Sequence, residues 1–371
     1  MKEVRLKDIC KKGSSQLKQK DVEKLSGPYP VYGASGQIAS MNSFHQDKDY
    51  IAIVKDGSGI GRVMFLPAKS SVIGTMQYIL PKEGYDIRYI GYCLQSLGLS
   101  SYKQGAAIPH IYFRDYGERI VNVEENIKKQ QAIVSKLDTA FAKIDEIKDN
   151  AKRALDEAIL LFDSCLNASM NSNNWASTDL KSVCSKIGSG STPKGGKKVY
   201  TKTGCSIIRS LNVHHNYFKY EDLAHITEAA AEALKGVTIK ENDVLFNITG
   251  ASIGRCCVVP ADVIPARVNQ HVCILRAENF VSPEFLSYQL NSRQHQRELL
   301  AIGEAGSTRQ ALTKKDLEKH IIYYPSPEEQ QRIVLKLDSM IKKIAEMQDN
   351  LEKVYAECEY LKDSILKQLF N

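Results

Sequence analysis

Two turns that contain glycine are the parts of this sequence closest to catalytic or cofactor-binding motifs. Residues 56–61 (Asp-Gly-Ser-Gly-Ile-Gly) follow an apolar run, but the strand-like residues 63–67 come next instead of the helix that a cofactor turn opens. Residues 193–198 (Pro-Lys-Gly-Gly-Lys-Lys) lack the first glycine of a phosphate loop, and Lys198 stands where Ser or Thr should be. Neither turn predicts a cofactor site. The basic loop 193–198 either faces phosphates or is a solvated turn.

Carboxylates, histidines and cysteines give no stronger sign of catalysis. Residues 145–146 (Asp-Glu) lie in an expected helix and predict a solvated face. The histidines show no metal-ligand spacing, and none of the nine cysteines forms a Cys-x-x-Cys pair. The sequence also lacks an apolar run long enough to cross a bilayer and an apolar secretion signal. We therefore expect a cytoplasmic protein in which this chain holds neither a metal nor a cofactor.

The charge of the 371 residues, +7 in total, is unevenly distributed. Lys and Arg outnumber Asp and Glu by 17 to 13 in residues 1–125 and by 19 to 14 in residues 172–325. Residues 126–171 are balanced at 7 to 7, and residues 326–371 are slightly acidic at 7 to 9. Because many solvated surfaces carry as much charge, the two basic segments are weak evidence for a polyanionic partner. The length suits two or three domains.

The chain repeats itself. Residues 130–150 and 330–350 are identical at 12 of 21 positions, and both begin with the pattern Gln-Gln-x-Ile-Val-x-Lys-Leu-Asp. The segments before them correspond more faintly, as in Ile-Gly-Arg at residues 60–62 and again at 253–255. The order is therefore lobe, helix, lobe, helix. The predicted domains are a first lobe (1–125), a long helix (126–171), a second lobe (172–325) and a second long helix (326–371).

Each long helix has an apolar seam whose spacing alternates between three and four residues for more than four heptads, which is typical of a coiled coil. Asn126 and Ser326 are suitable N-caps. About 40 residues make a helix of roughly 60 Å. The simplest partner for one seam is the other, in antiparallel orientation, although each seam could instead pack on its own lobe. The first seam comprises Ile133, Leu137, Ala140, Ile144, Ile147, Ala151, Ala154, Ala158, Leu161 and Cys165.

Short apolar runs on either side of glycine-containing turns predict strands, and short helices follow them. The predicted fold class is therefore α+β, with two pseudo-twofold-related lobes separated by an antiparallel coiled coil of two long helices. A twofold arrangement of two basic, non-identical lobes suits a DNA duplex, because each lobe can read a different short sequence. The expected strands are residues 50–54, 63–66, 243–248 and 256–259, and the expected helices are 89–97 and 283–291.

Several polar residues of the helices repeat although they lie off the seam. A recent duplication with solvated charges would explain them, but the lobes have diverged far more than the helices. Our hypothesis is that both helices bind two copies of the same partner. The candidate partner-binding residues are Gln131, Lys136, Asp138 and Lys143, with their counterparts Gln331, Lys336, Asp338 and Lys343.

This arrangement resembles the specificity subunit of type I restriction-modification systems. Residues 188–193 (Gly-Ser-Gly-Ser-Thr-Pro), 243–246, 253–255 and 269–270 look like landmarks of that family's recognition domains, whereas residues 12–15 of the first lobe depart from the pattern. The resemblance implies a non-catalytic chain whose lobes each read half of a bipartite DNA site. It further implies two modification (methyltransferase) subunits that carry S-adenosylmethionine, and restriction subunits that use ATP and Mg²⁺.

Two other functions compete with this interpretation. A DNA methyltransferase would use the turn 56–61, but its counterpart 249–254 has Ser252 in place of a glycine, and the sequence has no Pro-Pro pair for gripping a flipped base. A coiled-coil scaffold that does not bind DNA would leave the large basic lobes unexplained.

The candidate DNA contacts combine residue types that bind bases with types that bind phosphates. For Arg62 and Arg255, a role in bracing the adjacent glycine turn is the alternative. In the second lobe the candidates are Ser191, Thr192, Lys194, Arg209, Asn212, Thr249, Ser252, Arg255, Asn269, Gln270, Arg309 and Gln310, and in the first lobe they are Tyr32, Ser35, Lys55, Ser58, Arg62, Gln77, Lys103 and His110.

Overall fold

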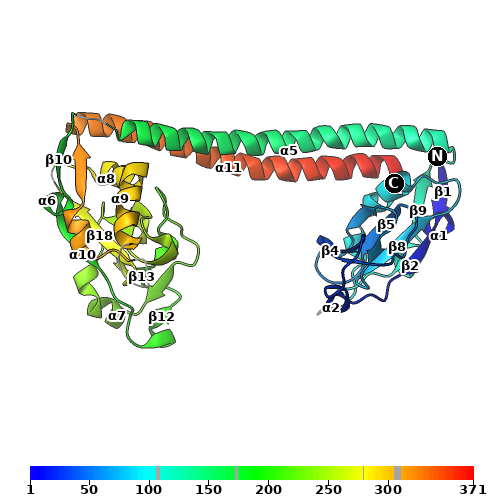
Figure 1. Cartoon of the computed structure of the whole chain (residues 1–371), viewed down its shortest axis with the longest axis horizontal. Coiled ribbons are helices and arrows are strands. Elements are labelled where there is room, and N and C mark those ends of the chain that lie inside the picture. Colours follow the sequence, from blue (N-terminus) through cyan, green and yellow to red (C-terminus); the bar gives the residue numbers. More distant parts are fainter. Residues whose placement is uncertain (106–108, 172–173, 279, 305–310) are drawn as a thin grey trace. The chain divides into compact units, whose positions relative to one another are not determined.

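A computed structural model describes residues 1–105, 109–171, 174–278, 280–304 and 311–371. The chain divides into two compact units, of which unit 1 comprises Met1–Arg153 with Asp349–Asn371 and unit 2 comprises Ala154–Gln348. Two long helices, α5 (Ile127–Ser169) and α11 (Pro327–Phe370), each contribute to both units (Figure 1). Within the described ranges, no helix is both long and apolar enough to span a membrane.

The lobe of unit 1 is built on a four-stranded antiparallel sheet, and helix α3 (Ile87–Ser96) packs against three of its strands. The strand order is β2 (Cys10–Ser14), β8 (Met76–Pro81), β5 (Tyr50–Val54) and β6 (Val63–Leu66). A second sheet has the order β4 (Gly36–Met41), β3 (Tyr29–Gly33) and β7 (Ser71–Val72). The remaining elements are β1 (Lys2–Arg5) paired with β9 (Ile120–Val123), and the short helices α1 (Leu6–Ile9), α2 (Gln19–Val22), η1 (Leu99–Tyr102) and α4 (Phe113–Tyr116).

Unit 2 repeats this plan with an enlarged second sheet. Its main sheet has the order β11 (Cys184–Ser189), β18 (Val272–Ala277), β15 (Val244–Asn247) and β16 (Cys256–Val258), and α8 (Pro283–Asn291) takes the place of α3. The second sheet has the order β12 (Tyr200–Thr201), β14 (Ala224–Ile226), β13 (Cys205–Ile208) and β17 (Ala266–Val268). The others are β10 (Ala176–Asp179) with β19 (Ile321–Tyr324), α6 (Leu180–Val183), α7 (Glu228–Ala233), α9 (Arg293–Glu304), α10 (Lys314–Lys319), η2 (Gly196–Val199), η3 (Ser210–Asn212), η4 (Lys235–Val237), η5 (Gly250–Ser252) and η6 (Ala261–Val263).

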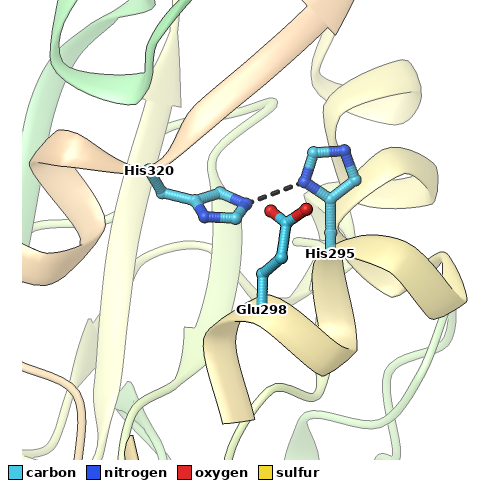
Figure 2. A group of neighbouring side chains, drawn as sticks. All are labelled: His295, Glu298 and His320. Carbon is cyan, nitrogen blue, oxygen red and sulfur yellow. Dashed lines mark hydrogen bonds between the residues drawn. The ribbon is translucent and has the colours of Figure 1, made fainter. Parts of the chain in front are cut away.

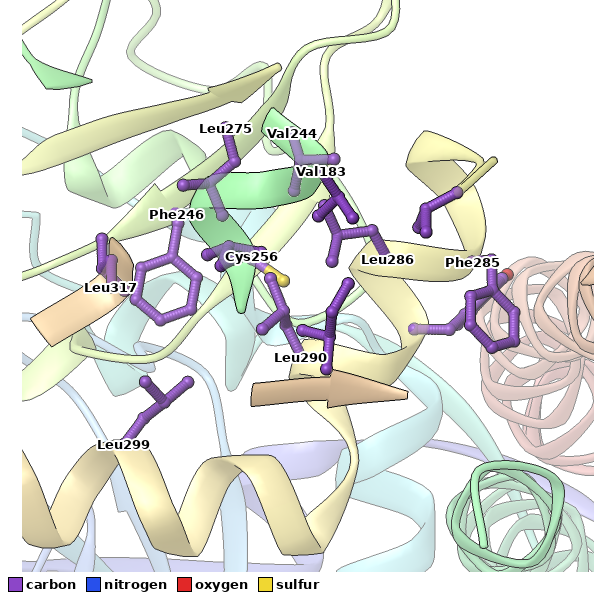
Figure 3. Packing of buried hydrophobic residues seen from close by; sticks show 14 of the residues in the cluster. Val183, Val244, Phe246, Cys256, Leu275, Phe285, Leu286, Leu290, Leu299 and Leu317 are labelled. Carbon is purple, nitrogen blue, oxygen red and sulfur yellow. The ribbon is translucent and has the colours of Figure 1, made fainter. Parts of the chain in front are cut away.

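The main sheet of unit 2 separates two hydrophobic cores, because side chains along a strand alternate between its faces. Val244 and Phe246 of β15 belong to the core beneath α8, together with Phe285 and Leu290, whereas Leu245 belongs to the core shared with the second sheet. Figure 3 shows the first of these cores, in which side chains of the strands meet those of α8. The predicted α+β lobes are therefore confirmed.

Both long helices complete the cores of the lobes. Val134 of α5 and Phe370 of α11 belong to the core of unit 1, and the Phe370 ring packs edge-on against Tyr89 with centroids 5.1 Å apart. In unit 2, Leu166 of α5 and Leu337 of α11 join the core beneath α8. The first turns of each long helix therefore pack on its own lobe, and its last turns pack on the other lobe. The alternative that each seam packs on its own lobe alone does not describe this packing.

The helices also pack on each other, in antiparallel orientation. In unit 1, Lys148 pairs with Glu359 at 2.7 Å and Asp145 pairs with Lys362 at 2.6 Å, so the residue number rises along α5 as it falls along α11. Next to these ion pairs the Cys358 thiol approaches the Ile144 carbonyl at 3.8 Å. The predicted antiparallel pairing of the long helices is thus confirmed.

The buried side of α5 departs from the predicted seam. Leu155 and Leu166 are buried although they lie off it, whereas the predicted seam residues Ile147 and Leu161 are 53% and 59% exposed. The buried Ile144, Leu155 and Leu166 are 11 residues apart. An 11-residue repeat corresponds to about 3.67 residues per turn, and a heptad repeat to 3.5. The apolar stripe of α5 therefore stays close to the natural helical period and drifts away from the heptad positions.

A buried glutamine anchors the start of each long helix to its lobe. In unit 1, Gln130 Oε1 accepts a hydrogen bond from the Asp86 N–H at 2.7 Å, and Gln130 Nε2 donates to the carbonyls of Gly84 and Glu124 at 3.2 and 2.7 Å. This amide binds the chain on both sides of the lobe, because Asp86 caps α3 and Glu124 lies just after β9.

The same network recurs in unit 2. Gln330 Oε1 accepts from the Ser282 N–H at 2.9 Å, and Gln330 Nε2 donates to the carbonyls of Phe280 and Pro325 at 2.7 and 3.1 Å. Gln130 and Gln330 are 0% and 1% exposed. Every bond of the amide that the first copy makes therefore has its counterpart in the second.

A tyrosine–aspartate pair adds a second attachment two turns further along each helix. Tyr92 donates to Asp138 and Tyr288 donates to Asp338, and Asp138 also pairs with Arg88 at 2.8 Å. Burial and the neighbouring carboxylate raise the pKa of Tyr92 to about 12, and the same causes raise the pKa of Tyr288. Both phenols therefore remain protonated and act as donors.

We predict that Gln330→Ala lowers the free energy of unfolding of unit 2 by about 1–3 kcal/mol, because it removes a buried side chain and its hydrogen bonds to the Ser282 N–H and to two carbonyls. Trp175, the sole tryptophan, packs against Phe285 in this unit, so its fluorescence during urea unfolding measures the change. Gln331 is the exposed neighbour, and Gln331→Ala is the matched control. This variant should change the free energy of unfolding by less than about 0.5 kcal/mol. Equal effects of the two variants would contradict the anchoring role of Gln330.

Candidate nucleic-acid interface

The two units close the same hairpin between the third and fourth strands of the main sheet. In unit 1 the Gly61 N–H donates to Val54 and the Val54 N–H donates to Arg62, at 2.8 and 3.0 Å. In unit 2 the Gly254 N–H donates to Asn247 and the Asn247 N–H donates to Arg255, both at 2.9 Å. Both glycines have a positive φ, +85° and +87°, which residues other than glycine rarely adopt.

This hairpin shows the structure of the turn that a cofactor site would have used. The glycine-containing residues 56–61 lead from β5 into β6, which are antiparallel neighbours, and do not open a helix. A cofactor turn needs helix N–H groups that face a phosphate. Residues 56–61 therefore form a loop at the end of the main sheet.

Four side chains from three segments of unit 2 form one hydrogen-bonded row beside the hairpin. Thr192 Oγ1 donates to Gln270 Oε1 at 2.6 Å, and Gln270 Nε2 donates to His271 Nε2 at 2.9 Å. His271 Nδ1 therefore carries the ring hydrogen and donates to Thr249 Oγ1, at 2.6 Å. The predicted contacts Thr192, Thr249 and Gln270 are thus brought together, and His271 connects them.

Gly190 allows the loop before Thr192 to approach this row closely. A Cβ atom at Gly190 would lie 1.7 Å from the Val268 carbonyl oxygen, so no other residue fits without moving the backbone. The Gly190 N–H donates to the Asn269 carbonyl at 3.0 Å, and Asn269 Oδ1 accepts from the His271 N–H at 3.0 Å. Asn269 therefore shapes the turn, while Ser191 and Lys194 are exposed on the adjacent loop.

A shallow hollow opens beside the row. It is lined by Ser210, Leu211, residues 249–252, Arg255 and His271, and so includes three predicted contacts, Thr249, Ser252 and Arg255. His214 stacks on Tyr217 with ring centroids 4.7 Å apart. Burial and then the positive charge of Arg255 lower the pKa of His214, which favours a neutral imidazole here.

Two predicted contacts of unit 2 hold the backbone instead of facing outward. Asn212 is fully buried, where its Oδ1 accepts from the Arg209 N–H at 3.1 Å and its Nδ2 donates to the Lys219 carbonyl at 3.0 Å. Arg209 is half-buried and its guanidinium donates to the Asp222 carbonyl. We leave Asn212 out of the candidate interface because its amide is buried and bonded to the backbone. Arg309 and Gln310 lie outside the described residues.

Unit 1 gathers its predicted residues around the equivalent hairpin. Exposed Arg62 donates to the Ala34 carbonyl at 2.8 Å, which places it against the loop of Ser35 and gives it the bracing role. His110 Nδ1 lies 2.6 Å from Asp56 Oδ1, and Lys55 pairs with the same carboxylate at 3.0 Å. Of the others, Ser35, Ser58 and Lys103 are exposed and Tyr32 is half-buried.

Gln77 does not join this group. It is 5% exposed, and its amide donates to the hydroxyl of the buried Tyr116. Its carboxamide is thereby directed into the lobe, so we also leave Gln77 out of the candidate interface.

The repeated polar residues of the long helices fall into two groups. Gln131, Lys136, Lys143 and their counterparts Gln331, Lys336 and Lys343 are exposed. Asp138 and Asp338 instead bind Tyr92 and Tyr288. An anchoring role within the chain therefore accounts for the repetition of these aspartates, which the sequence assigned to a partner surface.

Sequence reasoning missed three groups of residues in these sites. Gln130 and Gln330 repeat as faithfully as their exposed neighbours, and that repetition was an available signal. His271 follows directly after two predicted contacts and could have been included with them. His214 and Tyr217 carried no signal, because their stacking depends on the conformation of the loop between η3 and β14.

Comparisons with known proteins point to one family. The chain matches the family model described as the type I restriction modification DNA specificity domain over residues 1–156 and 172–355. The type I restriction enzyme EcoBI specificity subunit of Escherichia coli is 28% identical over 176 residues, which are 46% of this chain and 35% of that protein. The match thus spans about a third of the length of this curated relative.

Two solved structures share the fold. A chain from work on complex assembly and conformational transition of the type I R-M system has a TM-score of 0.71 at 17% identity, covering 99% of this chain and 97% of that one. The HsdS subunit from Thermoanaerobacter tengcongensis has a TM-score of 0.57 at 17% identity, covering 99% and 96%. At this identity the likeness concerns the fold alone. Since the family model matches both halves of the sequence, the chain belongs to the family of type I restriction-modification DNA specificity domains.

Proposed function

We propose that this chain is the DNA sequence-recognition subunit of a type I restriction-modification complex, in which each lobe reads one half of a bipartite site. The observation that carries the proposal is that the two units share their helix anchors but differ in their loops. The anchors of the long helices repeat residue by residue, whereas the loops around the equivalent hairpins differ. Two lobes with the same sheet and anchors but different loops suit the recognition of two different DNA sequences.

The chemistry of the loops fits DNA. Arg255 can donate two hydrogen bonds to guanine, and the amide of Gln270 can both donate a hydrogen bond to adenine and accept one from it. Lys194 and Lys103 are exposed and suit phosphate, which positions the protein without reading sequence. The positive charge of both lobes favours the same partner.

The hydrogen-bonded row from Thr192 to Thr249 gives a second reason to expect direct contacts with DNA bases. Its four side chains already satisfy one another, so their orientations are set before a ligand arrives. A preorganised site loses less conformational freedom on binding than a flexible one.

The long helices complete the proposal. We propose that α5 and α11 set the gap between the half-sites and that their exposed repeated residues dock two methyltransferase subunits. Lys136 and Lys336 represent this surface, at equivalent positions on the two helices. The domains would be residues 1–125 and 172–325 for recognition, with residues 126–171 and 326–371 as spacers.

In this proposal the chain makes and breaks no bond itself. The methyltransferase subunits carry S-adenosylmethionine, and restriction subunits carry ATP and Mg²⁺. The complex acts on DNA in the cytoplasm.

We predict that Arg255→Ala weakens binding to the cognate site about tenfold or more and relaxes selectivity at one base pair. Lys194→Ala should weaken binding to all sequences alike and reduce the salt dependence of the affinity by about one phosphate contact. Fluorescence anisotropy with cognate and scrambled duplexes over a salt series measures both effects. Lys235→Ala, an exposed lysine paired with Glu232, is the control. An affinity independent of salt would refute the proposed surface.

We predict that exchanging residues 1–125 for the equivalent lobe of a relative changes one half of the methylated sequence and leaves the other half as it was. Sequencing of methylated adenines in cells that carry each version reads out both halves. A change in both halves, or in neither, contradicts the assignment of one lobe to one half-site.

We predict that the double substitution Lys136→Glu and Lys336→Glu abolishes co-purification of the methyltransferase, because it reverses the charge of an equivalent exposed position on each helix. Lys342→Glu is the control, since Lys342 is exposed on α11 but its counterpart on α5 is Ala142. Circular dichroism checks that the helices persist. Retention of two methyltransferase subunits by the double variant would contradict this docking surface.

A further inference from the structure

Three side chains that commonly bind metal ions converge in unit 2. His295 and Glu298 lie three residues apart on α9 and so project from the same side of that helix. His320 lies between α10 and β19. One ligand atom of each residue lies within 4.8 Å of the others, and Figure 2 shows the Glu298 carboxylate directed toward the two rings. Sequence spacing gave no sign of this group, because His320 is brought in by the tertiary fold.

The two imidazoles meet in a buried environment. His295 Nδ1 and His320 Nε2 are 2.7 Å apart, and the two residues are 1% and 5% exposed. Burial lowers the pKa of His295 to about 3 and also lowers the pKa of His320. Both rings are therefore neutral near pH 7, and the facing nitrogens share one hydrogen.

We propose that His295, Glu298 and His320 bind a divalent transition-metal ion, for which zinc is the best match. Two neutral imidazole nitrogens and one carboxylate oxygen form a known type of zinc donor set, with a fourth position for water. The exposed Glu298 provides the negative charge. The proposal does not depend on the proposed DNA recognition.

Zinc binding requires both imidazole rings to turn toward the ion and the Glu298 carboxylate to move closer to them. Two nitrogens bound to the same tetrahedral zinc at about 2.0–2.1 Å lie roughly 3.3 Å apart. The rings therefore separate by about 0.6 Å from their hydrogen-bonded positions, and the shared hydrogen moves to the outer nitrogen of its own ring. Both facing nitrogens then present a lone pair to the ion.

A metal here would fasten two parts of the lobe. It would connect α9 to the segment between α10 and β19, and β19 pairs with β10 and leads into α11. Zinc would therefore stabilise unit 2.

The test uses the full chain without an affinity tag, stripped of metal and then dialysed against zinc. The wild type should retain about one zinc ion per chain more than His320→Gln, by mass spectrometry, and zinc should raise its midpoint of thermal unfolding. His225→Gln, a histidine of β14 outside the group, is the control and should retain zinc like the wild type. Equal zinc content in wild type and His320→Gln would overturn the proposal.

Two further measurements keep the test decisive. Cobalt in place of zinc should give visible absorption without a thiolate charge-transfer band, and a thiolate band would assign the metal to cysteine and refute the site. If His320→Gln does not fold, Glu298→Gln changes an exposed side chain and should weaken zinc binding by at least about tenfold, since even outer-shell changes cost this much. An unchanged zinc affinity in Glu298→Gln would also overturn the proposal.

Discussion

The buried amides of Gln130 and Gln330 are the constraint on which the rest of the structure depends. A carboxamide taken out of water is tolerated only if its donors and acceptor are satisfied, and here the backbone of the lobe satisfies them. These bonds join the first turns of a long helix to the chain before α3 or α8 and to the segment between the preceding strand and the long helix. The direction in which the helix leaves the lobe is therefore determined by hydrogen-bond geometry as well as by apolar contact, which has little directionality.

This constraint explains why the two units can differ so widely elsewhere. The main sheets keep one strand order, and Gly61 and Gly254 close equivalent hairpins with nearly the same φ. Beyond the hairpins, unit 1 places an Asp56–His110 pair where unit 2 has the row through His271. The units thus differ in these loops and in the second sheet, while the main sheet is kept. Loops tolerate variation better than buried elements do.

Much of this fold could be predicted from the sequence, because repetition and apolar periodicity are local signals. The long helices, the strands around the glycine turns and the lobe order follow from them. The direction of a polar side chain is not local. Gln77 and Gln270 look alike in the sequence, yet one bonds inside the lobe and the other lies in the exposed row. Leu155 replaced the predicted seam residues because a straight helix does not keep a strict heptad period.

The position of Phe370 in the core of unit 1 has a consequence for biosynthesis. The ribosome makes the first lobe early, but Leu366 and Phe370, which complete its core, are more than 200 residues further along the chain. At about 5–20 residues per second, they follow on the order of 10–50 s later. During that interval the nascent lobe exposes the apolar surface that α11 later covers, so chaperones have a defined time in which to shield it.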